Sequence, residues 1–472
     1  MNRKIALWGL GFFCLVFQSL ALAALSKSTL PITEMSQETI KCVGCHEKMN
    51  PGIVQEWGRS KHYGANVGCY ECHAAEKGDV DAYIHDDKKV KKSISILVTP
   101  KDCGTCHERA ASEMTNSRHA KAGHILDSLD NLLAEVVEGN REMVTPGFPG
   151  GNSAAAVNGC WQCHGSKVKV LEGGQLDPAT YPNTGIGRIN PDGSEGSCSA
   201  CHGRHAFSTA LAREPDNCGK CHLGPDHPQK EIYEESKHGI AFKAYQDQMN
   251  LDSAKWVVGV DYTAAPTCAT CHMGATEKQP SSHNVGDRIS WTNRPPISVR
   301  PEVMDAKMGL ESANLTWETR RENMVDVCNA CHSEAHTEQF YIQYDALIEL
   351  YNEKFAKPGK ALYETAKPLL KPAKFSNKLD WTWFELWHHE GRRARMAASM
   401  QAPDYTHWHG TYDLAKHFYT KMVPELEDLV NENLDSKDPV KAKAARDLQN
   451  KLIEVMKSNN HKWYLGMRDK VK

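Results

Sequence analysis

Cys160-Trp161-Gln162-Cys163-His164 is one of eight copies of the pattern Cys-x-x-Cys-His in this chain of 472 residues. Each copy holds two cysteines, so the pattern takes 16 of the 17 cysteines in the sequence. This spacing is the attachment signal of a c-type haem, in which two thioether bonds hold the porphyrin and the histidine binds the iron. The pattern therefore predicts eight c-type haems on one chain.

The attachment cysteines form pairs along the chain: Cys42 and Cys45, Cys69 and Cys72, Cys103 and Cys106, Cys160 and Cys163, Cys198 and Cys201, Cys218 and Cys221, Cys268 and Cys271, and Cys328 and Cys331. The predicted proximal iron ligands are His46, His73, His107, His164, His202, His222, His272 and His332. Two other uses of Cys-x-x-Cys are half of a zinc site and a disulfide pair. Neither requires a histidine directly after the second cysteine, and all eight copies have one.

Residues 1–24 have the pattern of a secretory signal peptide. Arg3 and Lys4 precede an apolar run from Ile5 to about Leu22, and Ala21-Leu22-Ala23 is a small-residue cleavage site. An uncleaved membrane anchor is the alternative, because the run is nearly long enough to cross a bilayer. Cleavage would remove Cys14, the one cysteine outside the motifs. We expect the mature protein in the periplasm.

The remaining chain divides by motif density. Residues 25–335 hold every motif, while residues 336–472 hold none and are rich in Glu, Lys, Ala and Leu. We predict a mainly α protein: an irregular octahaem domain, then a helical region in which Pro358, Pro368 and Pro372 interrupt or end helices. The helical region either packs between subunits or forms a lid over the chain's own haems. A formal net charge of −3 indicates no nucleic-acid partner.

The histidine count permits a second axial ligand for every iron. Eight of the 23 histidines belong to motifs, which leaves 15. An electron-transfer haem takes two strong axial ligands, whereas a catalytic haem keeps one face open. Three Ser-x-His copies follow haem motifs, at Ser60-Lys61-His62, Ser117-Arg118-His119 and Ser236-Lys237-His238. Ligation and ordinary packing are equally open for His85, His124 and His336, while His417 and His461 in the helical region suit structural roles.

Three further segments carry a resemblance to a known family. Residues 381–421 read WTWFELWHHEGRRARMAASMQAPDYTHWHGTYDLAKHFYTK, residues 185–205 read GIGRINPDGSEGSCSACHGRH, and residues 218–238 run from CGKCHLGPDHPQ to SKH. Together with the motifs, these segments resemble the octahaem hydroxylamine oxidoreductase family over nearly the whole mature chain.

The resemblance implies that the fourth haem, at His164, is catalytic and five-coordinate, and that the other seven have two histidine ligands. It implies an Asp and a His over the catalytic iron, which we match to Asp192 and His205. Such groups can accept the protons that hydroxylamine oxidation releases, although Asn-Pro-Asp-Gly alone is an ordinary turn sequence. The predicted distal ligands are His62, His119, His227, His238, His283, His389 and His409, with His124, His336, His388 and His407 in reserve.

In oxidative members of that family, a Tyr of a neighbouring subunit is bonded to the catalytic porphyrin. Tyr405 is the best match, with Tyr412 and Tyr419 as rivals. The resemblance thus implies a homotrimer that oxidises a small nitrogen compound, hydroxylamine or in a minor variant hydrazine, and passes electrons to a cytochrome or quinone-linked partner. Relatives without the cross-link act as reductases of nitrite or hydroxylamine. An electron carrier with every iron capped is the third possibility.

Overall fold

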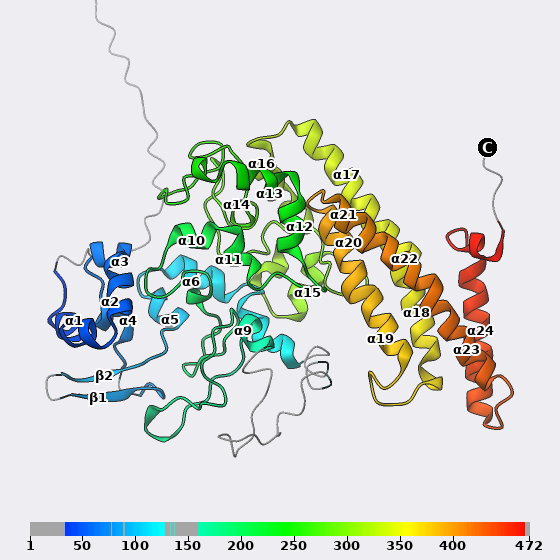
Figure 1. The fold of residues 1–472 in the computed structure, drawn as a ribbon, viewed down its shortest axis with the longest axis horizontal. Helices are drawn as coiled ribbons and strands as arrows, with labels where there is room; N and C mark the ends of the chain where they lie inside the picture. Colours follow the sequence, from blue (N-terminus) through cyan, green and yellow to red (C-terminus); the bar gives the residue numbers. More distant parts are fainter. Residues whose placement is uncertain are drawn as a thin grey trace, which may run out of the picture.

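The computed structural model describes residues 34–76, 78–87, 90–127, 133, 136 and 159–467. The predicted leader, with Cys14, lies outside the described residues. Figure 1 shows the motif-bearing part of the chain on one side and a stack of longer helices, ending in α24, on the other. The fold is helix-rich, as the sequence predicts. None of the helices within the described ranges combines the length and apolar character needed to cross a membrane.

The motif-bearing part consists of short helices joined by irregular segments. A single antiparallel hairpin is described in it, with Tyr83 paired to Ile94 and Asp87 to Val90. The elements of this part are α1 (Gln37–Met49), α2 (Pro51–Gly58), α3 (Lys61–Gly64), α4 (Cys69–His73), β1 (Tyr83–Asp87), β2 (Val90–Ile94), α5 (Pro100–Gly104), α6 (Glu108–Thr115), η1 (Ala120–Asp127), α9 (Cys160–His164), η2 (Glu172–Gly174), η3 (Cys198–Ala200), α10 (Thr209–Arg213), α11 (Pro215–Gly219), α12 (Gln229–Glu235), α13 (Lys237–Ala244), η4 (Gln246–Gln248), α14 (Cys268–His272), α15 (Pro301–Lys307), η5 (Glu311–Asn314) and α16 (Trp317–Asn329).

The C-terminal part begins directly after the last motif, where Ser333 caps the first long helix. Its elements are α17 (Glu334–Tyr351), η6 (Asn352–Ala356), α18 (Lys357–Ala366), η7 (Lys367–Leu369), α19 (Lys378–Phe384), η8 (Glu385–Glu390), α20 (Gly391–Ala398), α21 (Pro403–Thr406), η9 (His407–Tyr412), α22 (Asp413–His417), η10 (Phe418–Met422), α23 (Val423–Asn433), α24 (Pro439–Lys457) and η11 (Lys462–Leu465).

Pro358 does not interrupt its helix, contrary to the expectation from sequence. The preceding segment η6 is a wide π turn, and α17, η6 and α18 follow one another with helical backbone angles. Pro358 stands in the first turn of α18, where its missing N–H is tolerated. Pro368 lies in η7, directly after the α-helix ends at Ala366, as expected of a proline.

Ordinary apolar packing is concentrated in the C-terminal helices. Their buried cluster includes Leu386, Leu414, Phe418, Met422 and Leu426, all nearly inaccessible to solvent. The motif-bearing part has smaller clusters, such as the one around Trp256 and Tyr262. This distribution fits a domain in which large apolar prosthetic groups take the place of a side-chain core.

The two parts pack against each other. Tyr341, Tyr344 and Ile348 of α17 form a buried cluster with Trp291. Arg392 of α20 donates two hydrogen bonds, of 3.0 and 2.8 Å, to the carbonyl of Arg294. The C-terminal helices therefore form one wall of the space that the motifs surround.

Candidate haem-binding and redox site

Histidines from distant parts of the chain stand opposite motif histidines at one recurring distance. Metal–nitrogen bonds to imidazole are about 2.0 Å long, and a ring centre lies about 1 Å behind its nitrogen, so two axial imidazoles on one iron have centres about 6 Å apart. Five pairs of ring centroids have such separations: His46 and His85 at 6.3 Å, His107 and His62 at 6.1 Å, His222 and His119 at 6.1 Å, His202 and His283 at 6.4 Å, and His332 and His238 at 6.0 Å.

The three Ser-x-His repeats form one local structure. In each, the serine hydroxyl donates to the carbonyl three residues earlier, at 2.6 Å for Ser60, 2.6 Å for Ser117 and 2.7 Å for Ser236. The same oxygen accepts a backbone N–H from three residues later, at 3.1, 3.4 and 3.1 Å. Because each histidine occupies the same place relative to its serine, the repeat presents an imidazole in a fixed direction, and all three face a motif histidine.

Two motif histidines are oriented by hydrogen bonds at the nitrogen that would face away from iron. The Nδ1 of His73 lies 2.7 Å from the carbonyl oxygen of Ser95, and that of His46 lies 2.9 Å from Oδ1 of Asn50. When Nδ1–H donates to an oxygen, Nε2 is left with a lone pair for a metal. This is the arrangement expected of axial ligands.

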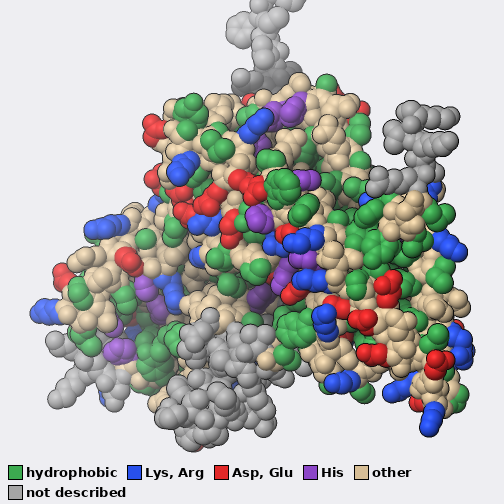
Figure 2. Space-filling model, turned by 45° about the vertical axis from the view of Figure 1, so that its right-hand side comes forward, with side chains coloured by type: hydrophobic (Ala, Val, Ile, Leu, Met, Phe, Trp, Pro, Cys, Tyr) green, Lys and Arg blue, Asp and Glu red, His purple; other side chains and the backbone are tan. Residues whose placement is uncertain are grey.

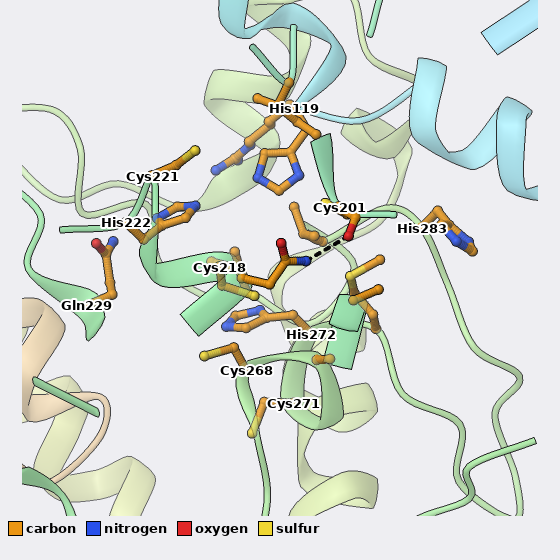
Figure 3. Close-up of a pocket in the computed structure, with 18 of the residues that line it drawn as sticks. His119, Cys201, Cys218, Cys221, His222, Gln229, Cys268, Cys271, His272 and His283 are labelled. Atoms are coloured by element: carbon orange, nitrogen blue, oxygen red, sulfur yellow. Dashed lines mark hydrogen bonds between the residues drawn. The ribbon is translucent and has the colours of Figure 1, made fainter. Parts of the chain in front are cut away.

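A cavity of about 2000 Å³ runs through the motif-bearing part. Cysteines and histidines of motifs three to eight line it, together with Cys72 of motif two. Figure 3 shows His119, His222 and His272 around one such space, with the cysteines of motifs six and seven beside them. On the face shown in Figure 2, histidine side chains also reach the surface in the middle of the molecule. The donor set, the paired imidazoles and the apolar cavity all fit c-type haems.

Contacts between cysteines of different motifs give the order in which the motifs adjoin. Neighbouring cysteines raise the pKa of a thiol between motifs one and two (Cys42 acting on Cys69), three and five (Cys198 on Cys103), four and six (Cys221 on Cys163), and six and seven (Cys268 on Cys218). After burial, a cysteine of another motif also contributes between motifs two and three (Cys106 on Cys72), five and six (Cys218 on Cys201), and seven and eight (Cys328 on Cys271). These neighbours give the order one, two, three, five, six, seven, eight, with motif four next to motif six.

Asp226 and His227 follow motif six and line the cavity that His164 of motif four also lines. Nε2 of His227 lies 3.5 Å from Oδ2 of Asp226, and Nη1 of Arg392 lies 3.6 Å from the same oxygen. The ring of His227 is 6.0 Å from that of His222, so it competes with His119 for the iron of motif six. The shared Ser-x-His geometry favours His119 as that ligand and leaves His227 to Asp226. A carboxylate, an imidazole and a guanidinium then meet beside motif six, on the wall of the cavity that motif four also lines.

Asp192, the carboxylate predicted to be catalytic, lies in a turn outside this cavity. Its side chain accepts hydrogen bonds from the hydroxyls of Thr99 and Ser194, both at 2.7 Å, and from the Ser194 N–H at 2.8 Å. Burial alone would raise the pKa of Asp192, but these hydrogen bonds from Ser194 and Thr99 hold it below its usual value. Asp192 thus belongs to the Asn-Pro-Asp-Gly turn, a few residues after a segment that is bonded to motif four, where the N–H of Gly187 donates to the carbonyl of His164 at 3.1 Å.

His205 lies nearer to motif two than to motif four. Its backbone N–H donates to Oε2 of Glu56 at 3.1 Å. The pKa of His205 is lowered by burial and then by the neighbouring charge of His73, the motif-two histidine. His205 is therefore a candidate second ligand for that motif, and the structure does not bring it together with Asp192.

Three other predicted or reserve ligands, His409, His389 and His336, do not form such an axial pair in the described structure. His409 is half exposed, with Nε2 3.4 Å from Asp404 and its ring 5.2 Å from that of Tyr405. The ring of His389 contacts those of Phe384 and His388, at 5.6 and 5.3 Å, and burial is the main cause that lowers the pKa of His389 to about 4. His336 stacks on His332 at 4.6 Å, which is too close for two rings on opposite sides of one iron.

The structure also places His124, a reserve ligand, and Tyr405, the predicted cross-linking residue. His124 of η1 lies beside α9, where its Nε2 is 2.8 Å from Oε1 of Glu195. Tyr405 is half-buried in α21, and its N–H donates to Oε1 of Glu235 at 3.2 Å. It packs against the small buried cluster of Ile232, Ala397 and Ala402. Trp408 and Tyr412, which follow it, are largely exposed.

Sequence reasoning missed the role of Asp226, although the signal was in the sequence. The segment Gly224-Pro225-Asp226-His227-Pro228 puts a carboxylate and an imidazole next to each other, four and five residues after His222 of motif six. The sequence analysis predicts His227 as a distal ligand. Only the folded chain shows that His119 has the same distance to His222.

Comparisons with known proteins agree with this site. The family "Seven times multi-haem cytochrome CxxCH" matches residues 192–358, and "Cytochrome c554 and c-prime" matches residues 18–74. A probable nitrite reductase-hydroxylamine oxidoreductase fusion protein of Kuenenia stuttgartiensis is 28% identical over 335 residues, which are 62% of this chain and 34% of that protein. The chain thus spans about a third of the length of this relative.

Two solved structures share the fold. A hypothetical multiheme protein aligns with a TM-score of 0.70 and 25% identity, over 85% of this chain and 97% of that one. The reducing HAO-like protein complex of Kuenenia stuttgartiensis aligns with a TM-score of 0.53 and 19% identity, over 89% and 87% of the two chains. Segments of the chain therefore match multihaem cytochrome c families, and the chain is similar to a probable nitrite reductase-hydroxylamine oxidoreductase fusion protein.

Proposed function

We propose that this chain is a periplasmic octahaem cytochrome c that oxidises hydroxylamine to nitric oxide or nitrite at the haem of motif four. The observation that carries the proposal is the placement of Asp226, His227 and Arg392 on the cavity wall that His164 shares. Motif four also adjoins motif six, which lies within the order of the other motifs. This position suits a catalytic centre that feeds electrons into a chain of carriers.

The bound haem would supply an iron that binds the nitrogen compound and takes its electrons. The side chains of this chain would handle the protons. His227 can accept a proton at Nδ1, because Asp226 lies against Nε2 and can hold the Nε2–H and stabilise the charged imidazole. Arg392 contacts the same oxygen of Asp226 and holds the carboxylate in place. The pair can therefore take up protons that the oxidation releases.

A reductase of nitrite or hydroxylamine is the second candidate. The name of the curated relative joins both activities, nitrite reductase and hydroxylamine oxidoreductase. Arg392 also favours this alternative, because a guanidinium beside the cavity attracts an anion such as nitrite. A non-catalytic electron carrier is the third candidate, in which a side chain would cap the iron of motif four as well.

Assembly and partners are part of the same proposal. The segment after Tyr405 exposes Trp408 and Tyr412, which suits contact with a neighbouring subunit, and we propose a homotrimer in which Tyr405 is cross-linked to the catalytic haem of the next chain. Electrons would leave to a cytochrome or a quinone-linked protein.

Steady-state kinetics of the purified, haem-loaded protein test the direction of the reaction. Hydroxylamine with an artificial electron acceptor should give sustained turnover, and nitrite with a reduced viologen should give a much lower rate. Turnover only in the viologen assay would make the protein a reductase. If neither assay gives turnover while the haems exchange electrons normally, the carrier function holds.

A further inference from the structure

Arg288 is a buried cation beside motif seven. It is 4% exposed and lies on the cavity wall. Its Nη1 donates to the carbonyls of Thr270 and Cys271, both at 3.3 Å, and its Nη2 donates to the carbonyl of Gly274 at 2.8 Å. These are carbonyls at the end of α14, the short helix that carries Cys268, Cys271 and His272. The guanidinium is therefore held against the attachment segment itself.

No carboxylate lies within ion-pair distance of this guanidinium in the described part of the chain. The ion pairs of the described residues do not include Arg288, whereas two other arginines of the same region are paired. Arg320 contacts Asp305 at 2.6 Å and Arg321 contacts Asp345 at 2.7 Å. Carbonyl oxygens satisfy the hydrogen bonds of Arg288, and the carboxylates of Asp287 and Asp326 act on its charge from beyond ion-pair distance. An arginine keeps that charge at any physiological pH.

Motif five offers a matched contrast. There the amide of Asn217 donates to the carbonyl of Cys201 at 2.8 Å, the dashed contact in Figure 3, so the second cysteine of that motif has a neutral donor. The equivalent carbonyl of motif seven, at Cys271, has a charged donor. The two motifs differ in charge at the same place.

We propose that Arg288 is a positioning residue that sets the reduction potential of the haem at motif seven above that of a haem without such a neighbour. A fixed positive charge in a low-dielectric interior favours the reduced iron, which carries one positive charge fewer than the oxidised iron. Motif seven adjoins motif six, which motif four also adjoins. A haem of raised potential at motif seven draws electrons from this junction toward motif eight.

The inference rests on the haem attachment of the proposed function and not on its substrate, so the test uses no substrate. The haem-loaded protein and Arg288→Gln are titrated from oxidised to reduced, with absorbance and electron paramagnetic resonance as readouts. Glutamine gives motif seven the neutral amide that Asn217 gives motif five. At a fixed potential, the ratio of reduced to oxidised iron should fall at least tenfold for one haem, which corresponds to about 59 mV for one electron.

Arg288→Lys should restore most of the potential because it keeps the charge. Asn217→Ala removes a neutral donor and should leave the reduction potential of the haem at motif seven unchanged. Arg288→Met preserves the side-chain volume and has the same expected shift as glutamine if Arg288→Gln does not accumulate. A fully haem-loaded Arg288→Gln or Arg288→Met protein with an unshifted titration overturns the proposal. Variants that carry one haem fewer by mass would also overturn it, because Arg288 would then serve attachment instead.

Discussion

The imidazole rings of His46 and His85 lie 6.3 Å apart, between a motif on α1 and the strand β1. Nδ1 of His46 is turned to Asn50, and Nδ1 of His85 has no hydrogen-bond partner in the described structure. The hairpin of β1 and β2 thus presents an imidazole at the separation expected of a second axial ligand for motif one.

Replacement of His85 by alanine should therefore open one iron. A five-coordinate haem is high-spin when oxidised, and an axial pair of histidines makes it low-spin, so we expect one high-spin signal in the electron paramagnetic resonance spectrum. His409→Ala is the matched control, because in the described structure His409 contacts Asp404 and Tyr405 and its ring contacts no motif histidine. A low-spin spectrum in the His85 variant would place another ligand at motif one.

The proposed proton acceptors Asp226 and His227 can be tested against Asp192, the carboxylate that the sequence predicts to be catalytic. Asp226→Asn and His227→Ala should each lower hydroxylamine turnover by ~10²-fold or more, the usual contribution of a positioned general base. Asp192→Asn should stay close to the parent rate, because its carboxylate serves the turn with Thr99 and Ser194. All three proteins should retain their haems by pyridine haemochrome assay. The reverse order of effects would return the catalytic role to Asp192.

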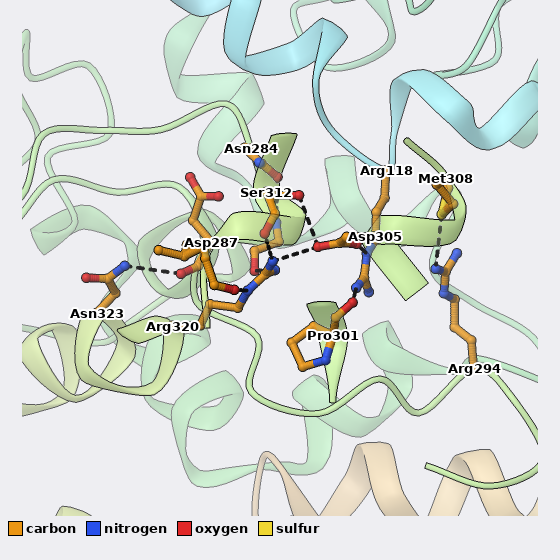
Figure 4. A network of polar contacts seen from close by, with 12 residues as sticks. Arg118, Asn284, Asp287, Arg294, Pro301, Asp305, Met308, Ser312, Arg320 and Asn323 are labelled. Carbon is orange, nitrogen blue, oxygen red and sulfur yellow. Dashed lines mark hydrogen bonds and ion pairs between the residues drawn. The ribbon is translucent and has the colours of Figure 1, made fainter. Parts of the chain in front are cut away.

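The Arg118–Asp305–Arg320 network predicts loss of stability in acid. Asp305 is fully buried and contacts Arg118 and Arg320, both at 2.6 Å (Figure 4). Burial alone would raise the pKa of Asp305, but the two arginines outweigh it and hold the pKa below its usual value. The stabilisation is therefore present above the unfolded pKa of about 3.9 and disappears as the pH falls through the lower folded pKa. Thermal unfolding followed from pH 7 to pH 3 should show this decline.

Asp305→Asn should cost about 3–5 kcal/mol in unfolding free energy at neutral pH, because two arginines lose their carboxylate, one of them fully buried. The variant should also lose part of the acid dependence. Asp447→Asn, which breaks an exposed pair with Lys443, should change stability by less than about 1 kcal/mol. Equal effects of the two substitutions on the denaturation midpoint would contradict the role of the buried network.

Tyr405 carries the prediction of a cross-linked trimer. Parent protein should migrate as linked chains in denaturing gels and show one haem spectrum distinct from the others, whereas Tyr405→Phe should migrate as single chains without that spectrum. The substitution should also shift activity from oxidation toward reduction of hydroxylamine. Tyr412→Phe is the control, because it removes the hydroxyl of a nearby, more exposed tyrosine. Single chains in the parent protein would favour the reductase.

The sequence predicted those parts of the site that depend on short-range patterns. Cys-x-x-Cys-His places two thiols and an imidazole within one turn, and Ser-x-His places a histidine relative to its serine, so both could be read without the fold. The pairing of His202 with His283 could not, because about eighty residues separate them and only the tertiary fold brings them together.

The positions that Asp192 and Pro358 take in the structure have equally specific explanations. Asp192 and Asp226 are both followed by polar or turn-forming residues, and nothing local tells a turn carboxylate from one that lines a cavity. Pro358 was expected to break its helix, yet the π turn of η6 precedes it and α18 begins just before it. Such wide turns depend on packing around the helix and have no strong signature in the sequence.

The thiol contacts between motifs bear on how the protein is made. Cys163 of motif four and Cys221 of motif six are neighbours in the folded chain, as are Cys103 and Cys198 of motifs three and five. In an oxidising compartment, neighbouring free thiols are joined by oxidases. A chain that folded before its cysteines had reacted would lock two motifs together by the wrong covalent bond. We therefore expect each thioether to form before the chain folds. The position of each motif along the chain would then set the order of haem attachment.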